Sequence, residues 1–189
     1  MLPDDKRWPL LKLLDNYLQR FPDEAETVKR YQDFISANID CFDRDLEAGH
    51  VTGSALLLDC GRRRVLLTHH RKLNKWLQPG GHSIGEVDIM AIAMREALEE
   101  SGLAAIKFIA CKLLDLDIHF IPGRKNEPGH IHYDCRFLLG SDGSDIFVVS
   151  EESNDLAWVP MERITDYTTE ASVRRMIKKA ELMLRSAKK

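Results

Sequence analysis

The sequence predicts an α+β fold in which helices and strands are layered together. Three stretches support this class: a helical pattern over residues 8 to about 40, strand-like segments between residues 50 and 159 that enclose one helix, and an amphipathic helix near the end. The chain has 189 residues, which is one domain of ordinary size plus an appendage. Hydrophobic residues make up 44% and charged residues 30%, so a packed core is expected rather than disorder.

The N-terminal stretch is expected to form two helices. Apolar side chains recur at helical spacing at Leu10, Leu14, Tyr17, Leu18 and Phe21, and again at Val28, Tyr31 and Ile35. Pro22 ends the first run, and Asp23 with Glu26 predicts a capping start for the second helix. We expect residues 1–47 to be a helical hairpin that covers a sheet or a partner subunit. These extra helices make a homodimer a reasonable expectation.

Residues 48–189 are expected to form a second unit that contains the strands. Strands are predicted at 50–58 and 64–68, joined by a turn at Gly61, and then at 106–110, 113–120, 131–138, 147–149 and 156–159. A helix is predicted from about 88 to 101, where Gly102 supplies the stop. The closing helix carries its apolar side chains at Val173, Met176, Ile177, Ala180 and Leu184.

Charge and composition exclude several classes of protein. The formal net charge is −3 and the sequence pI is near 6.2, which argues against a nucleic-acid binder or a protein of anionic membranes. No apolar run approaches the ~18 residues of a membrane span. The acidic amino terminus lacks the layout of a secretion signal, so a cytoplasmic protein is expected. The four cysteines are widely spaced and contain no C-x-x-C pair, so we expect reduced, mostly buried thiols.

Three carboxylates of the predicted central helix share one face. Glu96, Glu99 and Glu100 stand at i, i+3 and i+4. Like charges at this spacing repel by a few tenths of a kcal/mol per pair, and the nearby helix C-terminus disfavours negative charge. A hard divalent cation would relieve this repulsion, because Mg²⁺ and Mn²⁺ prefer oxygen ligands.

A glycine bend precedes this helix. Gly80 and Gly81 have no side-chain bulk, so their backbone groups can approach an ion or a phosphate closely. His82 follows directly and is expected to lie near that phosphate, where it can contact substrate.

The alternative to a metal site is a solvated acidic face. Ile89 and Ile92 lie on the same side of the helix, so this face is not simply exposed, and Arg95 is placed to orient or neutralise a carboxylate. On spacing alone, a metal site and a solvated acidic face are about equally well supported.

At these residues the sequence resembles a Nudix hydrolase of the MutT type. The family signature is a glycine, a loop with a glutamate, and then Arg-Glu-apolar-x-Glu-Glu-x-Gly-apolar. It is matched in register by Gly81, Arg95, Glu96, Ala97, Glu99, Glu100, Gly102 and Leu103. The resemblance covers roughly residues 48–165 and leaves the N-terminal helices outside. The loop glutamate is replaced by Val87, which lies between Glu86 and Asp88.

The resemblance implies an α/β/α sandwich with a mixed sheet. It also implies that the protein catalyses divalent-metal-dependent hydrolysis of a diphosphate linkage in a nucleoside diphosphate derivative or a similar small molecule. Mg²⁺ or Mn²⁺ would be held by Glu96 and Glu100 with the Gly80 carbonyl, and Glu99 would be a further ligand or would position water. Arg95 would hold Glu96 in place.

The resemblance leaves the general base open. Glu151 and Glu152 precede a late predicted strand and are candidates, although a charged turn is an equally good interpretation.

The sequence leaves two other functions open. An isoprenoid diphosphate isomerase, which uses the same fold, would need an active-site cysteine, and none of the four has an evident catalytic setting. A non-catalytic nucleotide sensor is disfavoured by the intact glutamates, but Val87 and the helical hairpin leave it open.

Other polar residues are expected to have ordinary roles. His130 and His132 would face the same side of a strand, but no H-E-x-x-H or His/Cys spacing accompanies them, so solvent or core roles are expected for most histidines. Asp134 and Arg136 are expected to pair with each other. The pairs Arg174-Arg175 and Lys178-Lys179 are expected on the outer face of the last helix.

Overall fold

The computed structural model describes residues 4–123, 128–151 and 153–186. Its helices are α1 (Trp8–Arg20), the short 3₁₀ helix η1 (Pro22–Glu24), α2 (Ala25–Ala37), α3 (Ile89–Ser101), η2 (Met161–Asp166) and α4 (Ala171–Ser186). Its strands are β1 (His50–Leu58), β2 (Arg64–His70), β3 (Lys75–Leu77), β4 (Gly80–His82), β5 (Ile106–Ile121), β6 (His130–Ser141) and β7 (Ser153–Pro160).

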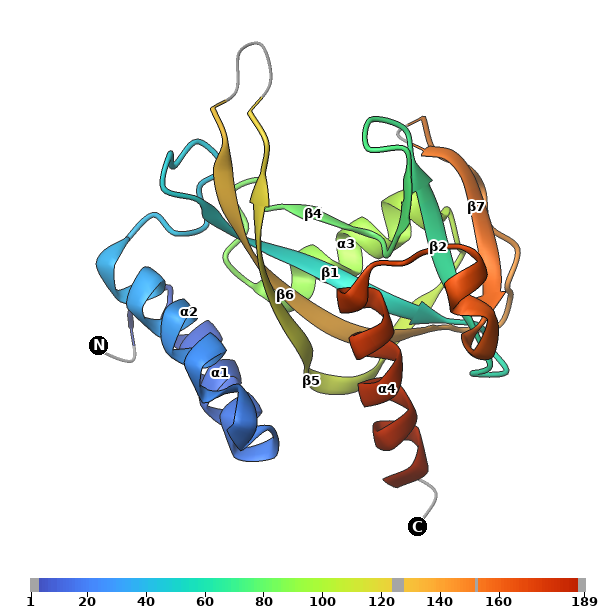
Figure 1. Ribbon diagram of the computed structural model, residues 1–189, viewed down its shortest axis with the longest axis horizontal. Helices are drawn as coiled ribbons and strands as arrows, with labels where there is room; N and C mark the ends of the chain where they lie inside the picture. Colours follow the sequence, from blue (N-terminus) through green and yellow to red (C-terminus); the bar gives the residue numbers. More distant parts are fainter. Residues whose placement is uncertain (1–3, 124–127, 152, 187–189) are drawn as a thin grey trace.

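The seven strands form one mixed sheet, as predicted. The strand order is β3-β2-β1-β6-β5, and β4 and β7 pair with β1 and β2 respectively. β1 and β6 run parallel, whereas the other pairs are antiparallel. In Figure 1, α3 lies behind the sheet and α4 crosses in front of it. Helices therefore cover both faces, and the α+β prediction is confirmed.

Each face of the sheet has its own hydrophobic core. Because successive side chains of a strand point to opposite faces, β1 sends Val51, Ala55 and Leu57 to one core and Leu56 and Leu58 to the other. The first core also contains the apolar sides of α1, α2 and α3, whereas the second is closed by α4.

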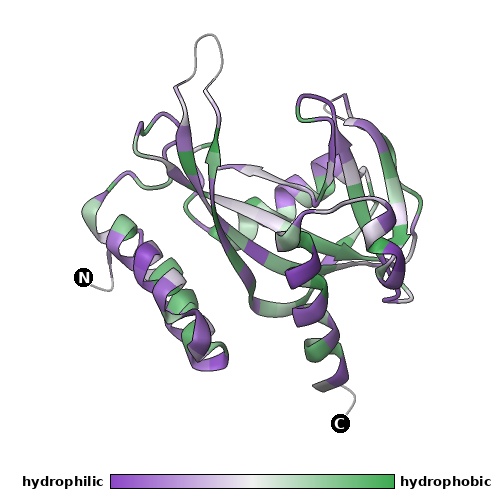
Figure 2. Ribbon diagram, in the orientation of Figure 1, coloured by the Kyte–Doolittle hydropathy of each residue, from purple (hydrophilic) through white to green (hydrophobic). Residues whose placement is uncertain are grey.

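The N-terminal hairpin packs on the sheet. The two helices have distinct apolar and polar sides (Figure 2). Tyr31 of α2 donates to a backbone carbonyl of β6 at 2.8 Å, and Phe34 stacks on Tyr133 with ring centroids 3.9 Å apart. The predicted capping start at Asp23 and Glu26 is wrong, because the chain forms η1 there and α2 begins at Ala25 without a side-chain cap.

Helix α3 has the ends that the sequence predicted. The Asp88 carboxylate accepts from the backbone N–H of Met90 at 2.9 Å, which caps the first turn. Gly102 ends the helix in the left-handed conformation, with φ +60°. These two residues fix where the acidic turn of α3 sits on the sheet.

Three other predictions need correction. The strands predicted at 106–110 and 113–120 are one strand, β5, whose register shifts between Phe108 and Asp115. The strand predicted at 147–149 is an irregular segment instead, and Val148 bonds to the end of α3. The thiols are not mostly buried, because Cys41 and Cys135 are buried but Cys60 and Cys111 are exposed.

None of the helices in the described ranges has both the length and the apolar character of a membrane span.

Candidate functional site

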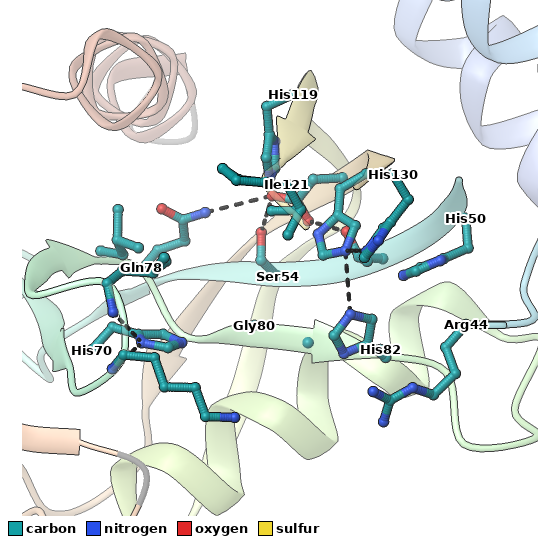
Figure 3. A pocket seen from close by; sticks show the side chains of 18 of the residues that line it. Arg44, His50, Ser54, His70, Gln78, Gly80, His82, His119, Ile121 and His130 are labelled. Carbon is teal, nitrogen blue, oxygen red and sulfur yellow. Dashed lines mark hydrogen bonds between the residues drawn. The ribbon is translucent and has the colours of Figure 1, made fainter. Parts of the chain in front are cut away.

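A cavity of about 670 Å³ opens over the polar ends of β1, β4 and β6. Figure 3 shows side chains from these strands pointing toward one another across it. Gly80, Gly81 and His82, predicted as phosphate-binding residues, line this cavity together with Glu100. The structure therefore brings the glycine bend and one of the three predicted glutamates to a single cavity.

The glycine bend lies against two of the predicted carboxylates. The backbone N–H of Gly80 donates to Glu100 Oε1 at 2.8 Å. A Cβ atom at Gly81 would lie 2.6 Å from Glu96 Cδ, so only glycine lets this carboxylate sit against the strand. Glu100 is nearly buried, and the Glu96 side chain is 13% exposed.

Arg95 joins the acidic turn to the bend. Its Nη1 atom lies 2.7 Å from Glu96 Oε1 and 3.1 Å from Glu99 Oε2, and its Nη2 atom donates to the His82 carbonyl at 2.7 Å. The guanidinium is thus placed to hold Glu96 in position. Glu99 is 59% exposed and is not among the residues that line the cavity.

The loop between the glycine bend and α3 contains Val87, which departs from the Nudix signature. Val87 is 37% exposed at the position of the expected glutamate. The neighbouring Glu86 uses Oε1 to accept from the backbone N–H groups of Val87 and Asp88, at 2.8 and 2.9 Å. The Glu86 carboxylate therefore organises its own loop.

A group of four histidines lies at the same cavity, although their positions in the sequence do not predict that they meet. Their potential ligand atoms all lie within 4.8 Å of one another: His50, His82, His130 and His132. The strand register explains the group, because β1 and β6 pair in parallel with His50 opposite His132, while His82 pairs with Thr52 of β1. The available signal was the alternation of polar residues at 50, 52 and 54 and at 130, 132 and 134.

Two of these imidazoles are neutral at pH 7. Burial, helped by the neighbouring His82 and His130, lowers the pKa of His50 to about 4. Burial and the surrounding imidazoles lower the pKa of His132 to about 2. These two rings therefore offer neutral nitrogens rather than positive charge to the cavity.

Beyond the histidines, the same sheet face carries a buried ionic network. Arg136 donates to Asp134 at 2.7 Å, as predicted, and also to Asp117 at 3.1 Å and Asp115 at 3.3 Å. Burial alone would raise the pKa of Asp117, but the hydrogen bond from His119 and the charge of Arg136 hold it below its ordinary value.

Helix α4 completes this network, which corrects one prediction. Arg175 donates to Asp115 at 2.8 Å and to Asp117 at 2.9 Å. Lys179 is buried and contacts Asp115 at 2.6 Å and Tyr17 of α1 at 2.5 Å. These two side chains thus point inward, not onto the outer face, because Asp115 and Asp117 of β5 would otherwise share with Asp134 the single cation of Arg136.

The general base stays a prediction. Glu151 is exposed in the turn before β7, and Glu152 lies outside the described residues.

A mixed sheet between helices, with an acidic helical turn held against a glycine bend, is the α/β/α arrangement that the resemblance to Nudix hydrolases implied. The sequence profile of the NUDIX domain matches residues 49–180. The chain therefore belongs to the Nudix hydrolase family, whose members generally use divalent metal ions.

Solved structures agree with this assignment. A NUDIX-family hydrolase from Clostridium perfringens is 26% identical, with a TM-score of 0.52, over 71% of this chain and 97% of that one. The E. coli dihydroneopterin triphosphate pyrophosphohydrolase is 19% identical (TM-score 0.55; 68% and 92% covered). A C. elegans Ap4A hydrolase is 17% identical (TM-score 0.51; 72% and 98% covered). These last two show likeness of fold alone. No curated protein matches the chain.

Proposed function

We propose that this protein hydrolyses a diphosphate linkage in a nucleoside diphosphate derivative or a related small molecule, with Mg²⁺ or Mn²⁺. The observation that carries this proposal is the contact of Glu100 and Glu96 with Gly80 and Gly81 at the edge of a cavity. The cavity is of a size that suits a small-molecule ligand.

The residues fit a hard divalent ion. The donor set consists of carboxylate oxygens, which Mg²⁺ and Mn²⁺ prefer, and the bend leaves no Cβ between strand and carboxylate. Glu96 and Glu100 would hold the ion with the Gly80 carbonyl, and Glu99 would be a further ligand or would orient water. When bound, such an ion polarises phosphoryl oxygens and lowers the pKa of water.

The remaining residues orient the reacting groups. Arg95 fixes Glu96 and ties the helix to the His82 carbonyl, so the acidic turn and the bend keep one geometry. The glycine bend and His82 line the cavity where the diphosphate would lie. A homodimer remains a prediction.

A panel of diphosphate-linked nucleosides tests this proposal. Each compound is incubated with the full chain and Mg²⁺ or Mn²⁺ in ¹⁸O-water, and mass spectrometry identifies the products and the bond that breaks. We expect monophosphate products that carry ¹⁸O, and none when EDTA is present. Binding of these compounds without turnover would favour the sensor, and isomerisation of an isoprenoid diphosphate without hydrolysis would favour the isomerase.

Glu100→Gln should lower turnover more than about 100-fold, because loss of even an outer-shell partner of a metal site costs about 10–100-fold. Glu162→Gln is the matched control, since Glu162 is exposed in η2. Equal turnover in both variants, at equal melting temperature, would remove Glu100 from the mechanism.

A further inference from the structure

The four histidines converge from three strands that are distant in sequence. His50 comes from β1, His82 from β4, and His130 with His132 from β6. Figure 3 shows the rings of His50, His82 and His130 turned toward one point of the cavity. No residue of the acidic turn belongs to this group.

One nitrogen of His132 lies close to two other ring nitrogens of this group. His132 Nε2 lies 3.2 Å from His82 Nε2 and 3.1 Å from His130 Nε2. An imidazole nitrogen carries either one proton or one lone pair, so hydrogen bonding explains both contacts only if that one group is shared between the two partners. A metal ion that takes one lone pair from each ring explains both contacts without sharing.

His50 provides a second, independent observation. The residue is only 1% exposed, and within the described part of the chain neither Nδ1 nor Nε2 has a hydrogen-bond partner. Buried polar groups normally have partners, and each exception calls for an explanation such as a bound ion. The ring lies beside those of His82, His130 and His132, with centroids 4.7 to 5.0 Å away.

The spacing of the nitrogens suits a tetrahedral ion. Four nitrogens at about 2.0–2.1 Å from Zn²⁺ lie about 3.3–3.4 Å from one another. The contacts of 3.1 and 3.2 Å are close to that edge length, and all four candidate ligand atoms lie within 4.8 Å of one another. His130 Nδ1 lies 3.0 Å from the Pro128 carbonyl, a contact that leaves the lone pair on Nε2.

We propose that His50, His82, His130 and His132 bind one transition-metal ion of the Zn²⁺ class, at a site separate from the carboxylate site. Imidazole nitrogen suits Zn²⁺, Cu²⁺ and Ni²⁺, whereas Mg²⁺ requires oxygen, so the two sites select different metals. Four protein ligands complete a tetrahedral shell, as in closed structural sites. The ion joins the ends of β1, β4 and β6 and fixes the wall of the substrate cavity.

Metal binding by the untagged full-length chain tests this proposal. After dialysis against a chelator, the chain is titrated with Zn²⁺ and, for spectroscopy, with Co²⁺. We expect one equivalent of Zn²⁺ by mass spectrometry, a rise in melting temperature, and the visible absorption bands of tetrahedral Co²⁺. Mg²⁺ should not compete. A chain that binds no Zn²⁺, or binds it with an octahedral Co²⁺ spectrum, would overturn the proposal.

Variants locate the ion. His132→Asn should weaken Zn²⁺ binding more than about 100-fold. His130→Gln provides a second variant at a partly exposed position and should have the same effect if His132→Asn does not fold. His69→Gln is the matched control, because His69 stacks on Trp76 and lies outside the group. Unchanged Zn²⁺ affinity in His130→Gln or His132→Asn would refute the assignment.

The same experiment separates the two sites. Glu100→Gln should keep its equivalent of Zn²⁺ while it loses Mg²⁺-dependent turnover. Zn²⁺ binding by a chain without hydrolase activity would leave this inference standing and remove the proposed function. Loss of Zn²⁺ from Glu100→Gln would show that the histidines do not form a separate site.

Discussion

The acidic turn of α3 and the ionic network under α4 each contain three carboxylates but are built differently. Glu96, Glu99 and Glu100 lie within a single helical turn, and two of them share Arg95. The aspartates of the network come from β5 and β6, and their cations come from β6 and α4. One group is local in sequence, whereas the other exists only because the sheet has formed.

The two groups also differ in charge balance and burial. Arg136 is 3% exposed and contacts three aspartates, and Arg175 and Lys179 add two further cations. In the acidic turn, by contrast, Glu99 is 59% exposed. Buried charges that are fully paired hold elements together, whereas clustered like charges beside a cavity are typical of ligand sites.

Removing Arg136 should cause the largest loss of stability among the substitutions that test this comparison. Arg136→Ala leaves three aspartates, two of them buried, short of a cation, so the free energy of unfolding should fall by about 3–5 kcal/mol. Denaturant titration followed by circular dichroism measures this change. Arg163→Ala is the control, because its ion pair with Asp166 is exposed and contributes about 0–1 kcal/mol. Equal losses in the two variants would mean that the network does not stabilise the fold.

A methyl group at Gly53 tests how closely α3 packs against β1. Its Cβ would lie 3.0 Å from Ala93 N and from Ile89 O, and both are backbone atoms that cannot turn aside. Gly53→Ala should therefore cost about 1–3 kcal/mol of stability by overpacking. Gly61→Ala is the matched control, with its nearest atom at 3.5 Å. A stable Gly53→Ala variant would show that α3 can shift on β1.

A methyl group at Gly81 should have the smallest effect on stability and a selective effect on activity. Its Cβ would meet the Glu96 carboxylate, the mobile end of a side chain, which can move aside. Gly81→Ala should therefore keep its melting temperature within a few degrees and lose about 10–100-fold in turnover, as expected for a displaced ligand. If turnover is unchanged, the contact between Glu96 and the bend is not part of the site.

Local sequence was sufficient to predict the acidic turn of α3 and the two ends of that helix. Asp88 and Gly102 predicted the ends of α3, and Glu96, Glu99 and Glu100 share a face because helical geometry depends on spacing alone. The same holds for the two N-terminal helices, whose apolar residues recur every three or four positions.

Only the tertiary structure decided which strands meet and which side chains face inward. His50 and His132 are 82 positions apart and become neighbours through the parallel register of β1 and β6. The sequence pattern predicts Arg175 and Lys179 on the outer face of α4, whereas in the structure both side chains bond to Asp115 of β5. The physical reason is that strand pairing and burial of charge are long-range events, so residue spacing encodes a helical face but not the partners across a sheet.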